Sequence, residues 1–133
     1  MKVNKTLNMT MLCDFYELTM GNGYFVSGMK DQICYFDVFY RNVPDNGGFA
    51  IAAGLEQVVE YIQDLHFSAE DIAYLRGRKL FDEGFLKYLE DFRFTGDIFA
   101  VPEGMPIFPK EPILTVRAPA IEAQLVETYI LLI

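Results

Sequence analysis

Tryptophan is absent from this chain of 133 residues, and histidine occurs only once, at position 66. The two cysteines, Cys13 and Cys34, have no metal-ligand spacing and no histidine beside them in sequence, so neither a zinc-finger pattern nor a thiolate–imidazole pair is indicated. The sequence also lacks a P-loop and a Gly-x-Gly-x-x-Gly motif. His66 follows a predicted helix, where a cationic imidazole is favoured, and a structural role is its simplest interpretation. The sequence therefore predicts no catalytic residue and no metal ligand within this chain.

Basic residues are also scarce. Eleven Lys and Arg face nineteen Asp and Glu, for a formal net charge of −8, which argues against nucleic acid or an anionic membrane as the main partner. No apolar run approaches the roughly 20 residues that span a bilayer. Residues 1–10 are mostly polar and lack the apolar region of a secretory signal. We therefore expect a cytoplasmic protein whose two cysteines are reduced thiols.

The residues that are present indicate an α+β fold with a substantial core, because 52% of the chain is hydrophobic and 15% aromatic. Residues 33–41 are apolar on both faces, which predicts a central strand or one covered on both sides. Three later strands separated by prolines predict an antiparallel meander, and residues 44–48 predict a turn. A helical stripe of apolar residues within 12–25 predicts a first helix with Asp14 as its N-cap, and further helices are predicted at 55–65, 68–77 and 82–89. The three later strands are predicted at 94–101, 105–108 and 113–117.

Residues 118–133 predict one final helix with almost no polar face, which must be buried against other elements. The sequence stops at Ile133 within this apolar run, without a capping residue, so we expect a truncated chain rather than a complete domain. A terminal helix docked into its own small core is the alternative. The expected division is an N-terminal α/β domain over 1–117 and, over 118–133, the start of a buried helix that leads into a missing domain.

Several segments resemble the N-terminal part of nicotinate phosphoribosyltransferases, in the order in which that family carries them. The first, MLCDFYELTM at 11–20, is similar to the opening motif of the family, although Cys13 stands where the family usually has threonine. A thiol in place of a hydroxyl weakens any hydrogen bond made there. The other segments are 36–41, 48–56, 71–75, 92–97, 102–104, 108–109 and 121–128.

This resemblance implies a type II phosphoribosyltransferase in which the N-terminal α/β domain sits on an irregular α/β barrel. Such an enzyme joins nicotinate to the ribose of phosphoribosyl pyrophosphate, which binds with Mg²⁺. It couples the reaction to ATP hydrolysis through a phosphorylated histidine beyond Ile133, whose motif does not include His66. The resemblance also implies a homodimer with active sites shared between subunits. A nicotinamide or quinolinate phosphoribosyltransferase is the closest alternative. The fragment alone, inactive in transfer, could instead be a non-catalytic binding or assembly domain.

The resemblance carries three substrate-binding residues onto this sequence. Tyr16 matches the tyrosine that packs on the pyridine ring, and Asp14 matches the aspartate two residues before it. Both can face one ligand only if Asp14 is the non-helical N-cap and Tyr16 lies in the first turn; otherwise Asp14 only caps the helix and Tyr16 is a core residue. Arg41 matches an arginine that reaches the phosphates of the neighbouring subunit's substrate, with a local ion pair as the alternative.

Overall fold

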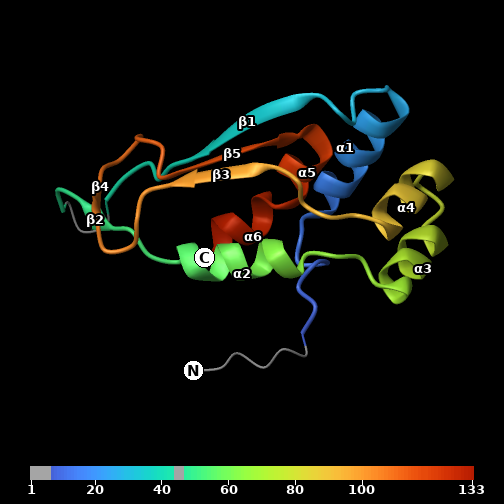
Figure 1. Cartoon of the computed structure of the whole chain (residues 1–133), viewed down its shortest axis with the longest axis horizontal. Helices are drawn as coiled ribbons and strands as arrows, with labels where there is room; N and C mark the ends of the chain where they lie inside the picture. Colours follow the sequence, from blue (N-terminus) through green and yellow to red (C-terminus); the bar gives the residue numbers. More distant parts are fainter. Residues whose placement is uncertain (1–6, 44–46) are drawn as a thin grey trace.

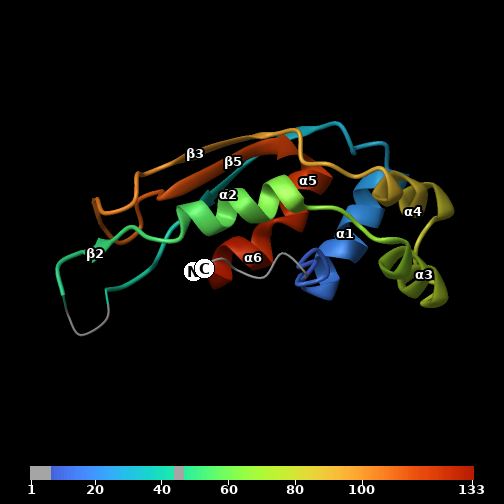
Figure 2. The same ribbon diagram turned by 60° about the horizontal axis from the view of Figure 1, so that its bottom comes forward.

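The computed structural model describes residues 7–43 and 47–133, so the turn predicted at 44–48 lies partly outside the described residues. Groups of helices and groups of strands follow one another along the chain. Figure 1 shows β1, β5 and β3 along one side of the molecule with α2, α5 and α6 beneath them. The helices α1, α3 and α4 are grouped at one end and the short strands β2 and β4 lie at the other, an arrangement that the second view also shows (Figure 2). The elements are α1 (Phe15–Val26), β1 (Ile33–Val38), β2 (Ala50–Ile51), α2 (Leu55–Asp64), α3 (Ala69–Gly77), α4 (Glu83–Glu90), β3 (Asp97–Ala100), β4 (Pro106–Ile107), β5 (Leu114–Pro119), α5 (Ala120–Leu125) and α6 (Glu127–Leu132).

The main sheet is antiparallel, in the order β1-β5-β3. β5, not β1, is therefore its central strand, and the prediction of a central or fully covered strand at 33–41 is wrong. Alternate residues of β1, Ile33 and Tyr35 among them, are exposed. On this exposed face the Tyr35 side chain has a polar partner on the neighbouring strand: Arg117 of β5 donates through Nε to the Tyr35 hydroxyl at 3.0 Å.

The predicted meander is correct for β3 and β5, which pair antiparallel, but wrong for the short strand between them. β4 pairs instead with β2 in a separate two-stranded sheet. Proline has no backbone N–H, so Pro106 within β4 can support only a short ladder. The turn before β4 is also fixed to the β2 segment, because the Gly104 N–H donates to the Ala52 carbonyl at 2.8 Å.

The three middle helices confirm their predictions. Ser68 and Asp71 form a reciprocal capping box at the start of α3, and the Asp82 side chain accepts from the Gly84 N–H at the start of α4. Below the main sheet lies one core, to which Leu18, Phe85, Leu89, Val116 and Ile121 contribute fully buried side chains. In the part of the chain that the structure describes, no helix is both long and apolar enough to cross a membrane.

The last helix is interrupted. The prediction of one continuous helix over 118–133 is wrong at Val126, whose backbone (φ −95°, ψ −7°) separates α5 from α6. Its predicted burial holds for α5, all of whose residues are buried, but not for Leu131 and Leu132, which are 61% and 64% exposed. Ile130 of α6 still contributes to the core, so the exposed part of α6 is its end. That residues 118–133 lead into a further domain stays a prediction.

Candidate functional site

The start of α1 holds two of the three residues singled out in the sequence. Asp14 is the N-cap, with extended backbone (φ −68°, ψ 142°), and its side chain makes no capping hydrogen bond. Its carboxylate is exposed, and its backbone N–H donates to Thr128 Oγ1 at 3.1 Å. The cap position of Asp14 is confirmed, while its carboxylate remains available to a ligand.

Tyr16 lies in the first turn of α1, as required for it to share a ligand with Asp14. Its side chain is 44% exposed, so the alternative of a core tyrosine is wrong. The Tyr16 hydroxyl donates to Glu127 Oε1 at 2.8 Å, and this bond, ahead of desolvation and neighbouring charges, raises the pKa of Tyr16 to about 12. Tyr16 thus offers an aromatic face to solvent, with its hydroxyl held by α6.

Glu17 attaches this turn of α1 to α6 from the buried side. Its side chain is 0% exposed, and Oε1 accepts both the Thr128 N–H at 2.9 Å and the Thr128 hydroxyl at 2.6 Å. Oε2 has no hydrogen-bond partner among the described residues. Burial raises the pKa of Glu17, against the lowering effect of the two Thr128 hydrogen bonds. Sequence reasoning missed Glu17, because an acidic residue in a first helical turn ordinarily indicates a solvated side chain near the helix dipole.

Cys13 and His66 lie close to this region without forming a reactive pair. Burial, reinforced by the charges of Glu17 and Asp14, raises the pKa of Cys13 to about 12, so the side chain is a neutral thiol at pH 7. Both cysteines are free. His66 Nδ1 lies 2.5 Å from the Asp64 carbonyl oxygen at the end of α2, an arrangement that accords with a structural role.

Arg41 is not brought to the start of α1. It follows β1 and is exposed, at the opposite end of this strand from the Ile33–Pro119 pair that adjoins α5. The neighbouring Tyr40 is tied to the β4 segment, since its hydroxyl donates to the Ile107 carbonyl at 2.7 Å. Within residues 7–43 and 47–133, no carboxylate forms a salt bridge with Arg41.

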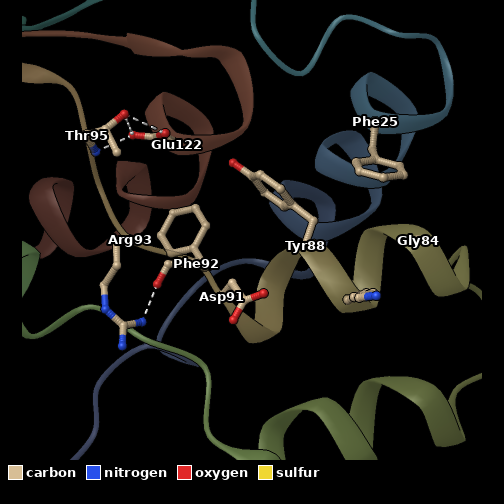
Figure 3. Close-up of a pocket in the computed structure, with 9 residues that line it drawn as sticks. Phe25, Gly84, Tyr88, Asp91, Phe92, Arg93, Thr95 and Glu122 are labelled. Atoms are coloured by element: carbon tan, nitrogen blue, oxygen red, sulfur yellow. Dashed lines mark hydrogen bonds between the residues drawn. The ribbon is translucent and has the colours of Figure 1, made fainter.

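An open groove of about 480 Å³ lies at the other end of α1 (Figure 3). Phe25, which lines it, follows Tyr16 by nine helical positions, or about 14 Å along the axis. The buried charge in the groove, Glu122, already accepts from the Thr95 N–H and hydroxyl, and Arg93 donates to the Phe92 carbonyl. This groove is separate from the Asp14–Tyr16 site and presents no unpaired buried charge.

The site at the start of α1 therefore combines an exposed aromatic face with a carboxylate that has no hydrogen-bond or salt-bridge partner within residues 7–43 and 47–133, on a turn that α6 holds from both sides. An aromatic face suits a flat heteroaromatic ring, and a carboxylate suits a cationic or hydrogen-donating edge. No group of three or more His, Cys, Asp and Glu side chains that could hold a metal occurs in the described part of the chain.

The architecture matches a solved phosphoribosyltransferase. The crystal structure of human nicotinic acid phosphoribosyltransferase superposes with a TM-score of 0.82 at 32% sequence identity, over 90% of this chain and 24% of the human one. The fold is thus that of the N-terminal domain of such an enzyme.

Sequence comparison gives the family. The model of the nicotinate phosphoribosyltransferase N-terminal domain matches residues 11–133. A nicotinate phosphoribosyltransferase of Mycobacterium tuberculosis is 44% identical over 91% of this chain and 26% of its own length. That of Bacillus subtilis is 36% identical over 93% of this chain and 25% of its own length. The chain belongs to the nicotinate phosphoribosyltransferase family, and it spans about a quarter of the length of these relatives.

Proposed function

We propose that this chain is the N-terminal part of a cytoplasmic enzyme of NAD salvage. The enzyme would join nicotinate to the ribose of phosphoribosyl pyrophosphate and release nicotinate mononucleotide and pyrophosphate. The family match over 11–133 supports the reaction class. The exposed ring of Tyr16, two residues after an exposed Asp14 carboxylate that makes no capping hydrogen bond, is the observation that supports a pyridine-binding role for this domain.

In this proposal Tyr16 and Asp14 orient the base. Offset stacking on the Tyr16 ring would hold the flat pyridine, with about 0.5–1.5 kcal/mol beyond the area that it buries. The pyridine nitrogen becomes positively charged as its bond to the ribose forms, and the Asp14 carboxylate would stabilise that charge if it lies near the ring. The start of α1 would thus bind the substrate and favour its transition state.

Groups outside this chain would supply the remaining chemistry. Mg²⁺ would enter with phosphoribosyl pyrophosphate, and a phosphorylated histidine in the barrel would couple ATP hydrolysis to the transfer. The family resemblance implies that this histidine lies in a motif beyond Ile133, which does not include His66. This domain would act by positioning.

Arg41 would bind the phosphates of the substrate held by the neighbouring subunit of a homodimer. The side chain of Arg41 is exposed and forms no salt bridge within residues 7–43 and 47–133, which supports its availability to a phosphate. The planar guanidinium can bind phosphate oxygens in a bidentate manner. Arg41→Lys would keep the charge and lose the fork, so it should raise the KM for phosphoribosyl pyrophosphate and leave that for nicotinate unchanged.

The test of base stacking is Tyr16→Ala in a full-length enzyme that carries this domain. Loss of the ring and its buried area should cost about 2–4 kcal/mol, or about thirty- to a thousandfold in kcat/KM for nicotinate. Tyr16→Phe keeps the ring face and should remain far closer to wild type. Separate titrations of nicotinate and phosphoribosyl pyrophosphate, with a melting curve, measure this; an equal loss for both substrates with a lowered Tm would contradict base stacking.

Subunit mixing tests the shared site. Tyr16→Ala subunits mixed with subunits inactivated in the barrel should recover activity, because one hybrid site then combines an intact tyrosine with an intact barrel. If activity stays absent although mass spectrometry shows exchanged dimers, Tyr16 does not act across the interface.

A further inference from the structure

Glu127, the first residue of α6, uses both of its carboxylate oxygens inside this domain. Oε1 accepts from the Tyr16 hydroxyl at 2.8 Å. Oε2 accepts from Gln124 Nε2 at 2.6 Å, and Gln124 is only 3% exposed. A chain of two hydrogen bonds thus connects the exposed tyrosine to a buried residue of α5.

The geometry restrains the Tyr16 side chain at both ends. Its Cβ is fixed by the first turn of α1, and its hydroxyl is fixed by Glu127. An exposed tyrosine otherwise exchanges between staggered χ1 rotamers, and these two restraints leave Tyr16 with one of them. Glu127 itself is half-buried and cannot follow a moving hydroxyl without giving up Gln124. The 44% of Tyr16 that stays exposed is therefore held in one orientation.

We propose that Glu127 is a positioning residue, which fixes the Tyr16 ring in the orientation that the pyridine substrate meets. This inference rests on the proposed function, because it takes the Tyr16 ring to be the surface on which the base stacks. In this inference Glu127 increases the affinity of the enzyme for the pyridine base although Glu127 does not contact the substrate. A ring that must first be ordered binds more weakly than one already in place.

The test uses a full-length enzyme that carries this domain. Glu127→Met keeps the length of the side chain and removes the acceptor. It should raise the KM for nicotinate by about three- to tenfold, the effect of one net hydrogen bond. The KM for phosphoribosyl pyrophosphate should change less than about twofold by the same reasoning. Glu127→Gln should restore near-normal values, because its amide oxygen can accept from Tyr16 once the Gln124 amide turns over.

Two controls separate positioning from general damage. Glu60→Met makes the same replacement on the exposed face of α2 and should leave both KM values unchanged. Tyr16→Phe removes the same hydrogen bond from the other side without altering α6. It should therefore raise the KM for nicotinate as much as a folded Glu127→Met variant, and it tests the hydrogen bond even if Glu127→Met folds poorly. The double variant Tyr16→Phe/Glu127→Met should be no worse than either single variant, since both remove one interaction.

Each result decides between the ideas. Fully additive losses in the double variant, or equal increases in both KM values, would overturn the role of Glu127. Glu127→Met with an unchanged KM for nicotinate, beside a Tyr16→Ala variant that raises it, would overturn this inference and leave the proposed function standing. An unaffected Tyr16→Ala variant would overturn both.

Discussion

Replacing Glu17 with alanine is expected to destabilise the domain by about 2–4 kcal/mol, because it removes the contact that holds α1 to α6. Glu17 is fully buried and accepts two hydrogen bonds from Thr128. Each donor left without a partner in a buried site costs about 1–3 kcal/mol, and the missing side-chain atoms leave a cavity. The unpartnered Oε2 reduces the total, since burying it is itself unfavourable.

Glu17→Gln separates the hydrogen bonds from the charge. Its amide oxygen can still accept from Thr128, so stability at pH 7 should remain within about 1 kcal/mol of wild type. Burial raises the pKa of Glu17 above its ordinary value of 4.5, which means that the folded state binds the proton more tightly than the unfolded state. In the wild type, the contribution that this raised pKa makes to the free energy of unfolding is complete below pH 4.5. It is lost as the pH rises through the pKa that Glu17 has in the folded state. The Gln variant lacks this decline.

Urea unfolding followed by circular dichroism, repeated between about pH 4.5 and 8, measures both effects. Glu60→Ala, on the exposed face of α2, is the matched control and should change stability by less than about 0.5 kcal/mol. An alanine variant at position 17 as stable as wild type would refute the structural role of Glu17. A Gln variant with the wild-type dependence on pH would refute the assignment of that dependence to Glu17.

Three further outcomes are expected of the 133-residue chain expressed alone. With nicotinate, phosphoribosyl pyrophosphate, ATP and Mg²⁺ it should form no nicotinate mononucleotide; turnover above that of a His66→Ala variant would contradict this. It should associate and bind a hydrophobic dye through the exposed end of α6, at Leu131 and Leu132, and a dye-free monomer in sedimentation would count against that surface. Gly96→Ala would place a Cβ 2.5 Å from the Arg117 carbonyl oxygen; it should cost about 1–3 kcal/mol, and an unchanged Tm would show that the backbone relaxes freely.

Local signals predicted much of the fold. Ser68 and Asp82 were identifiable as helix caps because a cap satisfies backbone groups within three residues of itself. The neighbours of β1 were not identifiable in this way. A run of apolar and aromatic residues indicates a strand, but a half-covered edge strand and a central one can share that composition, and pairing with β5 depends on residues about eighty positions away.

The candidate site likewise contains residues that the sequence predicted and residues that it did not. The positions of Asp14 and Tyr16 followed from the capping pattern together with the family resemblance. Glu127 and Gln124 did not, because polar residues on a helix are ordinarily solvated and nothing local marks a partner 111 residues earlier. The break at Val126 was equally hidden, since the apolar pattern of 118–133 fits a continuous helix.

The break at Val126 has a consequence for the order in which the domain assembles. In an uninterrupted helix the Thr128 N–H would donate to the carbonyl four residues earlier; the break releases it to bind Glu17. The two partners are separated by 111 of the 133 residues, so closing this contact requires one of the longest loops that the chain can form. During synthesis the N-terminal turn emerges first and stays without its partners until α6 has left the ribosome. The turn that carries Asp14 and Tyr16 is therefore completed only after α6 has been synthesised.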